Sequence, residues 1–179
     1  MNGKLILVSG LSGSGKTTLI GGALQALPEL VYIKTYTTRP MRASEESSHE
    51  YVFVDEAQYS QRRQAAIEWD HTEYAGFKYG ADAGAVKAAI GTGKTVICSV
   101  APDLSVIEEM AKLYIAEPIT FWIKVPKELA KQRVYGDDIR DSRSEDIAIS
   151  TNFDQVFEPV GNLEKDIALF VDLLRSLMK

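Results

Sequence analysis

Short apolar runs alternate along the chain with segments in which apolar residues recur every three or four positions. Apolar runs without internal alternation are typical of parallel strands buried on both faces, whereas the second spacing is typical of helices with one buried face. The expected strands are residues 5–8, 30–33, 51–54, 67–69, 95–100, 119–125 and 155–158. This alternation predicts an α/β protein built on a parallel sheet.

Helices are expected between these strands, and several have recognisable ends. Asp55 and Asp82 precede helical segments as N-caps, because a carboxylate there accepts hydrogen bonds from the first turn. Gly21 and Gly22 lie inside the first helix, where each costs about 1 kcal/mol relative to alanine, so we expect this helix to pack closely against a neighbour. The expected helices are residues 19–27, 56–63, 85–90, 102–113, 126–135 and 163–178.

Residues 10–18, with the sequence GLSGSGKTT, lie between the first strand and the first helix and carry the strongest chemical signal. They fit the phosphate-loop pattern G-x-x-x-x-G-K-[ST], in which glycines let backbone N–H groups surround phosphates. Lys16 would reach the β- and γ-phosphates, Thr17 would place its hydroxyl on Mg²⁺, and Thr18 would cap the loop or contact a phosphate. The alternative is a glycine-rich turn with a chance lysine, and the position between strand and helix argues against it. The expected nucleotide contacts are Gly10, Ser12, Gly13, Ser14, Gly15, Lys16, Thr17 and Thr18.

Residues 35–50 lack an apolar period and are expected to form an exposed loop. Within them Arg39 and Arg42 stand close together, and paired guanidinium groups suit a second phosphate because each binds phosphate oxygens through a planar fork. Two solvated arginines are the alternative. The position of this pair after a phosphate loop favours the phosphate site.

Two further segments carry candidate chemistry. Residues 74–80 hold three aromatic residues around two glycines, which predicts a turn that presents rings to a flat ligand or packs them onto a small subdomain. Residues 136–146 are charged and nearly free of apolar residues, and Arg133, Arg140 and Arg143 lie in or beside them. Such a segment is either a lid that closes over a triphosphate or a solvated charge run.

Composition narrows the class of protein. A chain of 179 residues suits one domain with a full core. Its 20 basic and 25 acidic residues give a net charge of −5, so we expect no general attraction to nucleic acid or to a membrane. The single cysteine, Cys98, lies in an apolar run, and the first strand is too short for a signal peptide. We therefore expect a cytoplasmic protein.

The phosphate loop, TTRPMR at residues 37–42 and EYVFV at residues 50–54 together resemble the guanylate kinase family, over residues 3–162. The resemblance implies a P-loop NTPase-type parallel sheet flanked by helices. The core would be residues 1–35 and 90–179, with a monophosphate-binding subdomain at residues 36–89 and an arginine-bearing lid at residues 133–146. It implies ATP and Mg²⁺ as cofactors and a small-molecule nucleotide as substrate.

Site residues follow from the same resemblance. Those that would bind the phosphate of the monophosphate are Thr35, Arg39, Arg42, Tyr51 and Tyr79. Glu68 would accept hydrogen bonds from the base, and guanine offers a ring N–H and an exocyclic amine side by side. Catalysis would bring two anions in line and neutralise their charge. The residues implied in this step are Lys16, Arg39, Arg133, Arg140 and Arg143.

The chain departs from the family at the base site. Ala81 stands where the family has serine or threonine, so one hydroxyl contact to the base is absent. Ser99 and Ala101 stand where the family has two aspartates, one near Mg²⁺ and one at the base. Residues 70–77 also form a connection about two residues longer than the family's. These departures bear on which acceptor the protein uses.

Three functions are compatible with these residues. The main expectation is a kinase that transfers the γ-phosphoryl group of ATP to a nucleoside monophosphate, with GMP or dGMP first. The missing polar contacts favour instead a kinase of another phosphorylated small molecule, such as a sugar phosphate. A non-catalytic module that binds a phosphorylated peptide is the third, although such domains usually have degraded phosphate loops and this loop is intact.

Overall fold

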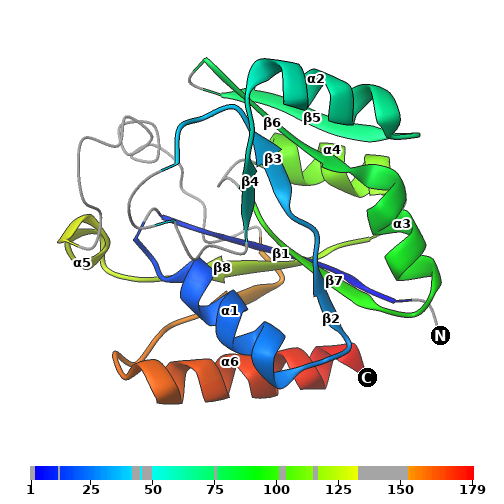
Figure 1. The fold of residues 1–179 in the computed structure, drawn as a ribbon. Helices are drawn as coiled ribbons and strands as arrows, with labels where there is room; N and C mark the ends of the chain where they lie inside the picture. Colours follow the sequence, from blue (N-terminus) through cyan, green and yellow to red (C-terminus); the bar gives the residue numbers. More distant parts are fainter. Residues whose placement is uncertain are drawn as a thin grey trace.

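A five-stranded parallel sheet forms the centre of the protein, with helices on both of its faces (Figure 1). The computed structural model describes residues 3–11, 13–41, 45, 50–74, 76–100, 104–114, 117–132 and 153–179. The strand order is β2 (Leu30–Tyr32), β7 (Thr95–Ser99), β1 (Leu5–Gly10), β8 (Ile119–Ile123) and β9 (Gln155–Phe157). Every neighbouring pair is parallel, so the predicted α/β fold with a parallel sheet is confirmed.

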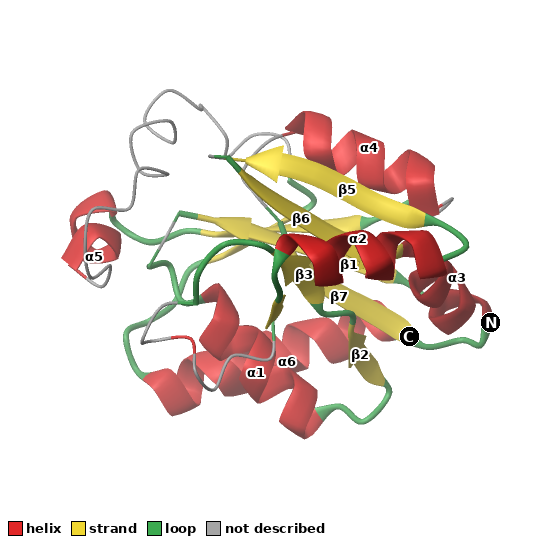
Figure 2. Cartoon of the chain, turned by 45° about the horizontal axis from the view of Figure 1, so that its top comes forward, coloured by secondary structure: helices red, strands yellow, loops and turns green. Residues whose placement is uncertain are grey.

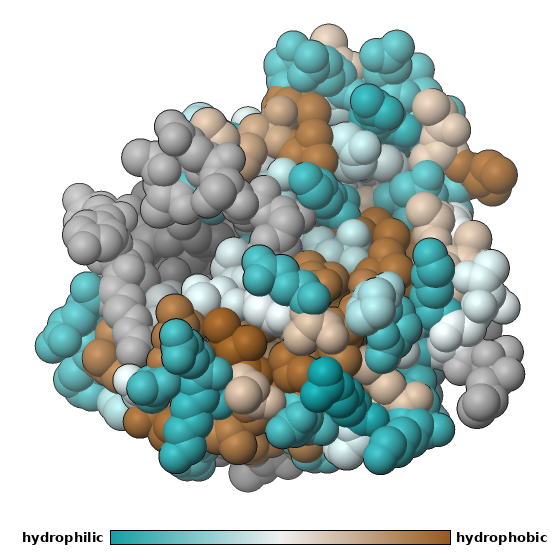
Figure 3. Space-filling model, turned by 60° about the horizontal axis from the view of Figure 1, so that its bottom comes forward, coloured by the Kyte–Doolittle hydropathy of each residue, from teal (hydrophilic) through white to brown (hydrophobic). Residues whose placement is uncertain are grey.

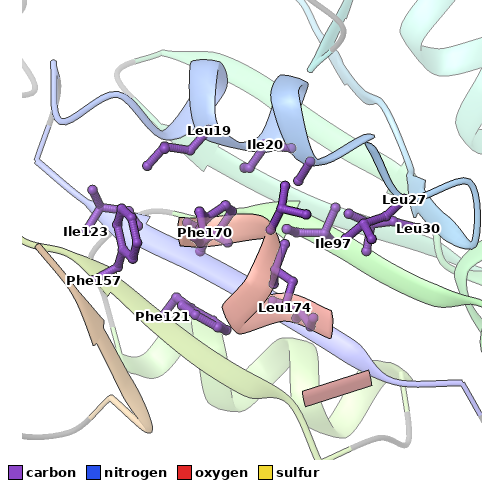
Figure 4. Packing of buried hydrophobic residues seen from close by; sticks show 14 residues of the cluster. Leu19, Ile20, Leu27, Leu30, Ile97, Phe121, Ile123, Phe157, Phe170 and Leu174 are labelled. Atoms are coloured by element: carbon purple, nitrogen blue, oxygen red, sulfur yellow. The ribbon is translucent and has the colours of Figure 1, made fainter. Parts of the chain in front are cut away.

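The central strand β1 is buried along its whole length, as its unbroken apolar run predicts. Ile6 and Val8 pack under α1 (Lys16–Ala26) and α6 (Leu163–Met178), and Figure 4 shows the side chains of these two helices meeting those of the sheet. Leu5 and Leu7 point to the opposite face, under α3 (Ala83–Gly91) and α4 (Leu104–Tyr114). The two faces of one strand therefore bury two separate apolar clusters.

Helices α1 and α6 approach each other closely at Gly22. A Cβ atom there would lie 2.5 Å from Cγ2 of Ile167, which is closer than carbon atoms can pack. The expected close packing of the glycine-containing helix is confirmed at this position. On the molecular face that includes α1 and α6, hydrophilic side chains surround apolar ones (Figure 3).

A second, four-stranded sheet has the order β4 (Tyr51–Phe53), β3 (Thr35–Thr37), β6 (Phe77–Asp82) and β5 (Trp69–Tyr74). Strands β3 and β4 are parallel, and the other two pairs are antiparallel. Helix α2 (Glu56–Ala65) lies against this sheet (Figure 2). Its Tyr59 is 2% exposed, and the Tyr59 hydroxyl bonds to Trp69, His71 and the carbonyl of Tyr79.

The predicted exposed loop at residues 35–50 is wrong at its beginning. Residues 35–37 form β3, because β4 on one edge and β6 on the other provide backbone hydrogen-bond partners that an apolar period does not reveal. Thr37 is fully buried and Arg39 is 7% exposed. The polar segment 35–37 thus forms a strand because it pairs with strands distant in sequence.

The prediction for residues 67–80 also needs correction. The strand begins at Trp69 and runs to Tyr74, and Ile67, which we expected in a strand, is fully exposed outside it. The expected turn at 74–80 is mostly strand β6, which Gly76 precedes with a φ of 78°. The two strands form a hairpin from Trp69 opposite Asp82 to Tyr74 opposite Phe77.

The predicted helix caps are confirmed. Asp55 accepts from the backbone N–H of Gln58 at 2.7 Å, and the Gln58 side chain accepts from Asp55 N–H at 3.1 Å. Asp82 accepts from Ala85 N–H at 3.0 Å. Helix α5 (Lys127–Gln132) follows β8, and the predicted lid at residues 133–146 lies outside the described residues. Within the described part of the chain, no helix has the length and apolar character that crossing a membrane requires.

Candidate functional site

The predicted phosphate loop connects the carboxyl end of β1 to the first turn of α1. Gly15 is the N-cap of α1 with a φ of 92°, a conformation that favours glycine. Glycine has no side chain that could accept from the first-turn N–H groups, so these groups are available to an anion at the positive end of the helix. The local geometry is that of an anion site.

Close packing holds the beginning of the loop. A Cβ atom on Gly10 would lie 2.8 Å from the carbonyl oxygen of Ile123 and 2.8 Å from Oγ of Ser14. The Ser14 hydroxyl is buried and has no hydrogen-bond partner among the described residues. A buried hydroxyl without a partner is costly, and it is one of the groups that a bound phosphate would satisfy.

Lys16 lies over the loop that it serves. Its Nζ donates to the carbonyl oxygens of Gly10 at 2.8 Å and Leu11 at 3.0 Å. Thr17 and Thr18 follow on the first turn of α1 with exposed side chains. The ammonium and the Thr17 hydroxyl are therefore at one end of one helix, as the motif predicts, and Ser12 lies outside the described residues.

Strand register brings three of the other predicted residues, Thr35, Tyr51 and Tyr79, onto one face of the small sheet, which we call the inner face. Residues directly opposite each other in paired strands share a face, and residues two apart in one strand do as well. Thr35 lies opposite Tyr51, and Asp70 lies opposite Ala81. The inner face thus carries Thr35, Thr37, Tyr51, Phe53, Asp70, Thr72, Tyr79 and Ala81. Helix α2 covers the opposite face, where its Tyr59 forms hydrogen bonds with Trp69 and His71.

Arg39 forms the centre of a cluster at one end of the inner face. Its guanidinium carbon lies 5.5 Å from the ring centroid of Tyr51 and 5.3 Å from that of Phe53. The rings of Tyr51 and Tyr79 lie edge to face at 6.4 Å between centroids. Three of the predicted phosphate-binding residues are therefore together, and Arg42, the other predicted guanidinium, is outside the described residues.

Glu45 completes this cluster and was not expected from the sequence. Its two carboxylate oxygens accept from the two terminal nitrogens of Arg39 at 2.8 and 3.0 Å. Burial acts to lower the pKa of Arg39, but the hydrogen bonds and charge of Glu45, with a smaller contribution from Tyr79, raise the pKa above its usual value. The guanidinium group of Arg39, which would bind phosphate oxygens, thus binds the two oxygens of a carboxylate in this structure.

Glu68, the predicted base-binding residue, lies directly before β5. Its Oε2 accepts from Nζ of Lys87 on α3 at 2.5 Å, and its side chain is 38% exposed. Asp70, two residues along, accepts from the hydroxyl of Tyr114 on α4 at 2.9 Å. Only the tertiary structure reveals Lys87 and Tyr114 as partners, because both lie on helices distant in sequence.

Of the two positions where the family has an aspartate and this chain has none, the structure describes one. Ser99 ends β7 and lies opposite Val8 of β1, beside the strand end that enters the phosphate loop. Ala101 and the lid arginines Arg133, Arg140 and Arg143 lie outside the described residues. In the described part of the chain, no group of three or more His, Cys, Asp or Glu side chains is arranged to hold a metal ion.

The sheet order, the loop after the central strand and the anion-ready helix end define this protein as a P-loop α/β protein. The family profile described as guanylate kinase matches residues 2–162. The chain therefore belongs to the guanylate kinase family.

Sequence relatives agree with this assignment. The chain is 39% identical over 100 residues to a guanylate kinase from Rubrobacter xylanophilus, covering 55% of this chain and 51% of the relative. It is 36% identical over 100 residues to a guanylate kinase from a Nostoc species, covering 56% of this chain and 50% of the relative. The matches thus span about half the length of these curated relatives.

Solved structures share the fold. The crystal structure of guanylate kinase from Anaplasma phagocytophilum has a TM-score of 0.67 and 20% identity, covering 99% of this chain and 87% of that chain. An unliganded sugar kinase from a Janibacter species has a TM-score of 0.54 and 16% identity, covering 97% of this chain and 95% of that chain. At these identities the likeness concerns the fold alone.

Proposed function

We propose that this protein transfers the γ-phosphoryl group of ATP to a nucleoside monophosphate, with GMP or dGMP as the preferred acceptor. The observation that carries the proposal is the presence of two separate candidate anion sites. One is the loop that ends in Lys16, and the other is the Arg39 cluster on the inner face. Family membership supports the same reaction.

On the ATP side, the loop supplies backbone N–H groups and Lys16 supplies a positive charge to the β- and γ-phosphates. The exposed hydroxyl of Thr17 and the unpartnered hydroxyl of Ser14 fit a phosphate-bound Mg²⁺ and a phosphate oxygen. Mg²⁺, when bound, supplies further charge neutralisation between phosphates. Because the described residues offer few ligands for the ion, the nucleotide would bring most of the oxygens around it.

On the acceptor side, Arg39 would exchange the carboxylate of Glu45 for the phosphate of the monophosphate, since both anions match the same planar fork. Tyr51 and Tyr79 would add hydroxyl contacts, with Thr35 at the start of β3. Arg42, Arg133, Arg140 and Arg143 would neutralise the transferred phosphoryl group. Catalysis then comes from alignment and charge, with no covalent intermediate.

The base would lie beside Glu68. This carboxylate is half-exposed and already paired with Lys87, so an acceptor without guanine's two donors does not leave it isolated. The penalty for a wrong base is then smaller than for a fully buried carboxylate. We expect a preference for guanine together with measurable activity on other bases.

The experiment is a coupled assay of ADP formation with ATP, Mg²⁺ and a panel of acceptors. The panel contains the common ribonucleoside and deoxyribonucleoside monophosphates and a set of sugar phosphates. Higher kcat/KM for GMP or dGMP than for every other acceptor supports the proposal. Turnover of a sugar phosphate alone would overturn it, as would phosphopeptide binding without any turnover.

A further inference from the structure

Asp70 is an inner-face carboxylate to which the resemblance assigns no role. It lies on β5 directly opposite Ala81 on β6, the position where a hydroxyl is missing, and two residues after Glu68, which precedes the strand. Cβ atoms of directly opposed residues are about 5 Å apart, so the Asp70 side chain reaches the space beside Ala81. Glu68 directly precedes β5, and its carbonyl oxygen accepts from the backbone N–H of Ala83 at 3.0 Å, so Glu68 lies at the end of the hairpin, two residues from Asp70.

The surroundings of Asp70 hold its carboxylate in place. Its Oδ2 accepts from the hydroxyl of Tyr114 at 2.9 Å, and Tyr114 is 3% exposed. Burial raises the pKa of Asp70, while the hydrogen bond from Tyr114 acts in the opposite direction. Burial, with a contribution from the charge of Asp70, also raises the pKa of Cys98 on β7 to about 12. Asp70 therefore points from the small sheet toward the central sheet.

The carboxylate retains capacity for a ligand. An ionised carboxylate has about four acceptor positions. The hydroxyl of Tyr114 and the backbone N–H of His71 are the donors to Asp70. Among the described residues this leaves acceptor positions on a half-buried carboxylate that lies on the same face of the sheet as Tyr79.

We propose that Asp70 is a specificity-determining residue, whose carboxylate accepts a hydrogen bond from the exocyclic amine of the acceptor base. This inference rests on the proposed function, because it assumes a nucleoside monophosphate on the inner face. Tyr79 is near the phosphate end of that face and lies opposite Thr72, and Asp70 is two residues before Thr72 on β5. Asp70 therefore lies between Tyr79 and Glu68, which directly precedes the strand. The base edge that contacts Glu68 thus passes Asp70.

The competing explanation is a purely structural tie between β5 and α4 through the Asp70–Tyr114 hydrogen bond. The two explanations differ in what a change at Asp70 does to discrimination between acceptors. A structural tie affects all acceptors and the melting temperature. A base contact affects only acceptors that carry the amine.

The test compares GMP with IMP, which lacks only the exocyclic amine, in the wild type and in Asp70→Asn. In the variant a weaker, neutral acceptor replaces the carboxylate, so kcat/KM for GMP should fall about tenfold, while the value for IMP changes by less than about twofold. The KM for ATP should not change. Glu73→Gln, which removes an exposed carboxylate from the same strand, is the matched control and should leave the GMP to IMP ratio unchanged.

Two further variants and substrates separate the outcomes. Tyr114→Phe removes the tie but keeps the carboxylate, so its GMP to IMP ratio should stay closer to the wild type than that of Asp70→Asn. An unchanged ratio in Asp70→Asn, with equal loss of melting temperature in both variants, would leave Asp70 a structural residue and overturn the inference. A fall in kcat/KM for GMP without a fall for dGMP would indicate that Asp70 contacts the ribose, and this result would also overturn the inference. If the wild type phosphorylates neither GMP nor IMP, the proposed function itself fails.

Discussion

At the scale of single residues, the two basic groups proposed for phosphate binding are already held by oxygen atoms of the protein. Two carbonyl oxygens accept from Lys16, and the carboxylate of Glu45 accepts from Arg39. Phosphate oxygens would therefore replace protein oxygens of similar geometry, which avoids reorganising a solvated side chain during binding. Both cations are placed before the ligands arrive.

Lys16→Ala should lower kcat for phosphoryl transfer by on the order of a hundredfold or more, because the ammonium stabilises developing phosphate charge. Circular dichroism and melting temperature should stay close to the wild type, since the side chain lies on the loop surface rather than in an apolar cluster. Lys94→Ala is the matched control, because Lys94 follows GTG in the connection before β7 and is exposed. Wild-type turnover in Lys16→Ala would remove Lys16 from the mechanism.

Arg39→Ala should weaken binding of the acceptor far more than binding of ATP, because Arg39 lies at the inner face and not on the phosphate loop. Loss of a charge-assisted bidentate contact is expected to raise the acceptor KM or lower kcat by about tenfold or more. Steady-state kinetics with each substrate varied in turn measures this. Arg62→Ala removes a guanidinium from the α2 side of the same sheet, 5.5 Å from the Tyr36 ring, and serves as the control. A change confined to the KM for ATP would contradict the two-site assignment.

At the scale of elements, the packing of α1 on α6 ties the helix after the phosphate loop to the rest of the core. Side chains of both helices bury the same face of the central sheet, as the labelled residues in Figure 4 show. Gly22 permits the close approach of the two helices. A glycine that lowers helix propensity is retained here because a larger residue would push the helices apart.

Gly22→Ala should therefore lower the free energy of unfolding by about 1–3 kcal/mol, since the overpacking against Ile167 exceeds the gain in helix propensity. Denaturant titration followed by circular dichroism measures the change. Gly91→Ala is the control, because a Cβ atom at Gly91 would meet nothing within 4 Å. Equal stability of the wild type and Gly22→Ala would show that α1 and α6 can separate without cost.

At the scale of the whole molecule, two sheets with different roles share one chain. The central parallel sheet buries an apolar cluster on each face and carries the phosphate loop. The small sheet is covered by α2 on one side and carries the candidate acceptor residues on the other. Hydrogen bonds such as Tyr114 to Asp70 connect the layers. Transfer between two bound anions requires such a connection, because both sites must hold their relative position.

The reactivity of the buried Cys98 thiol measures whether the core at β7 stays closed. Burial raises its pKa to about 12, and its side chain is 8% exposed, so the thiolate is almost absent near pH 8. Alkylation of the native protein should be at least about a hundredfold slower than alkylation in denaturant. Mass spectrometry of timed samples measures both rates. Rapid native labelling would mean that the core at β7 opens locally without global unfolding.

Local signals alone determined a large part of this protein. The phosphate loop, the capping residues Asp55 and Asp82 and the buried run of β1 depend on neighbours within a few positions, so their sequence patterns are sufficient. Arg39, Tyr51 and Tyr79, which the resemblance assigned to one phosphate, lie together in the structure, and their binding of that phosphate stays a prediction.

Only the tertiary structure decided the remaining features, because their partners are distant in sequence or their composition is uninformative. The polar segment 35–37 becomes β3 through pairing with β4 and β6. Glu68 pairs with Lys87, and Asp70 accepts from Tyr114, because β5 and the residue before it lie against helices α3 and α4. Hydrophobic periodicity reports which face of an element is buried. Hydrophobic periodicity does not indicate which polar group of the covering element will contact that face.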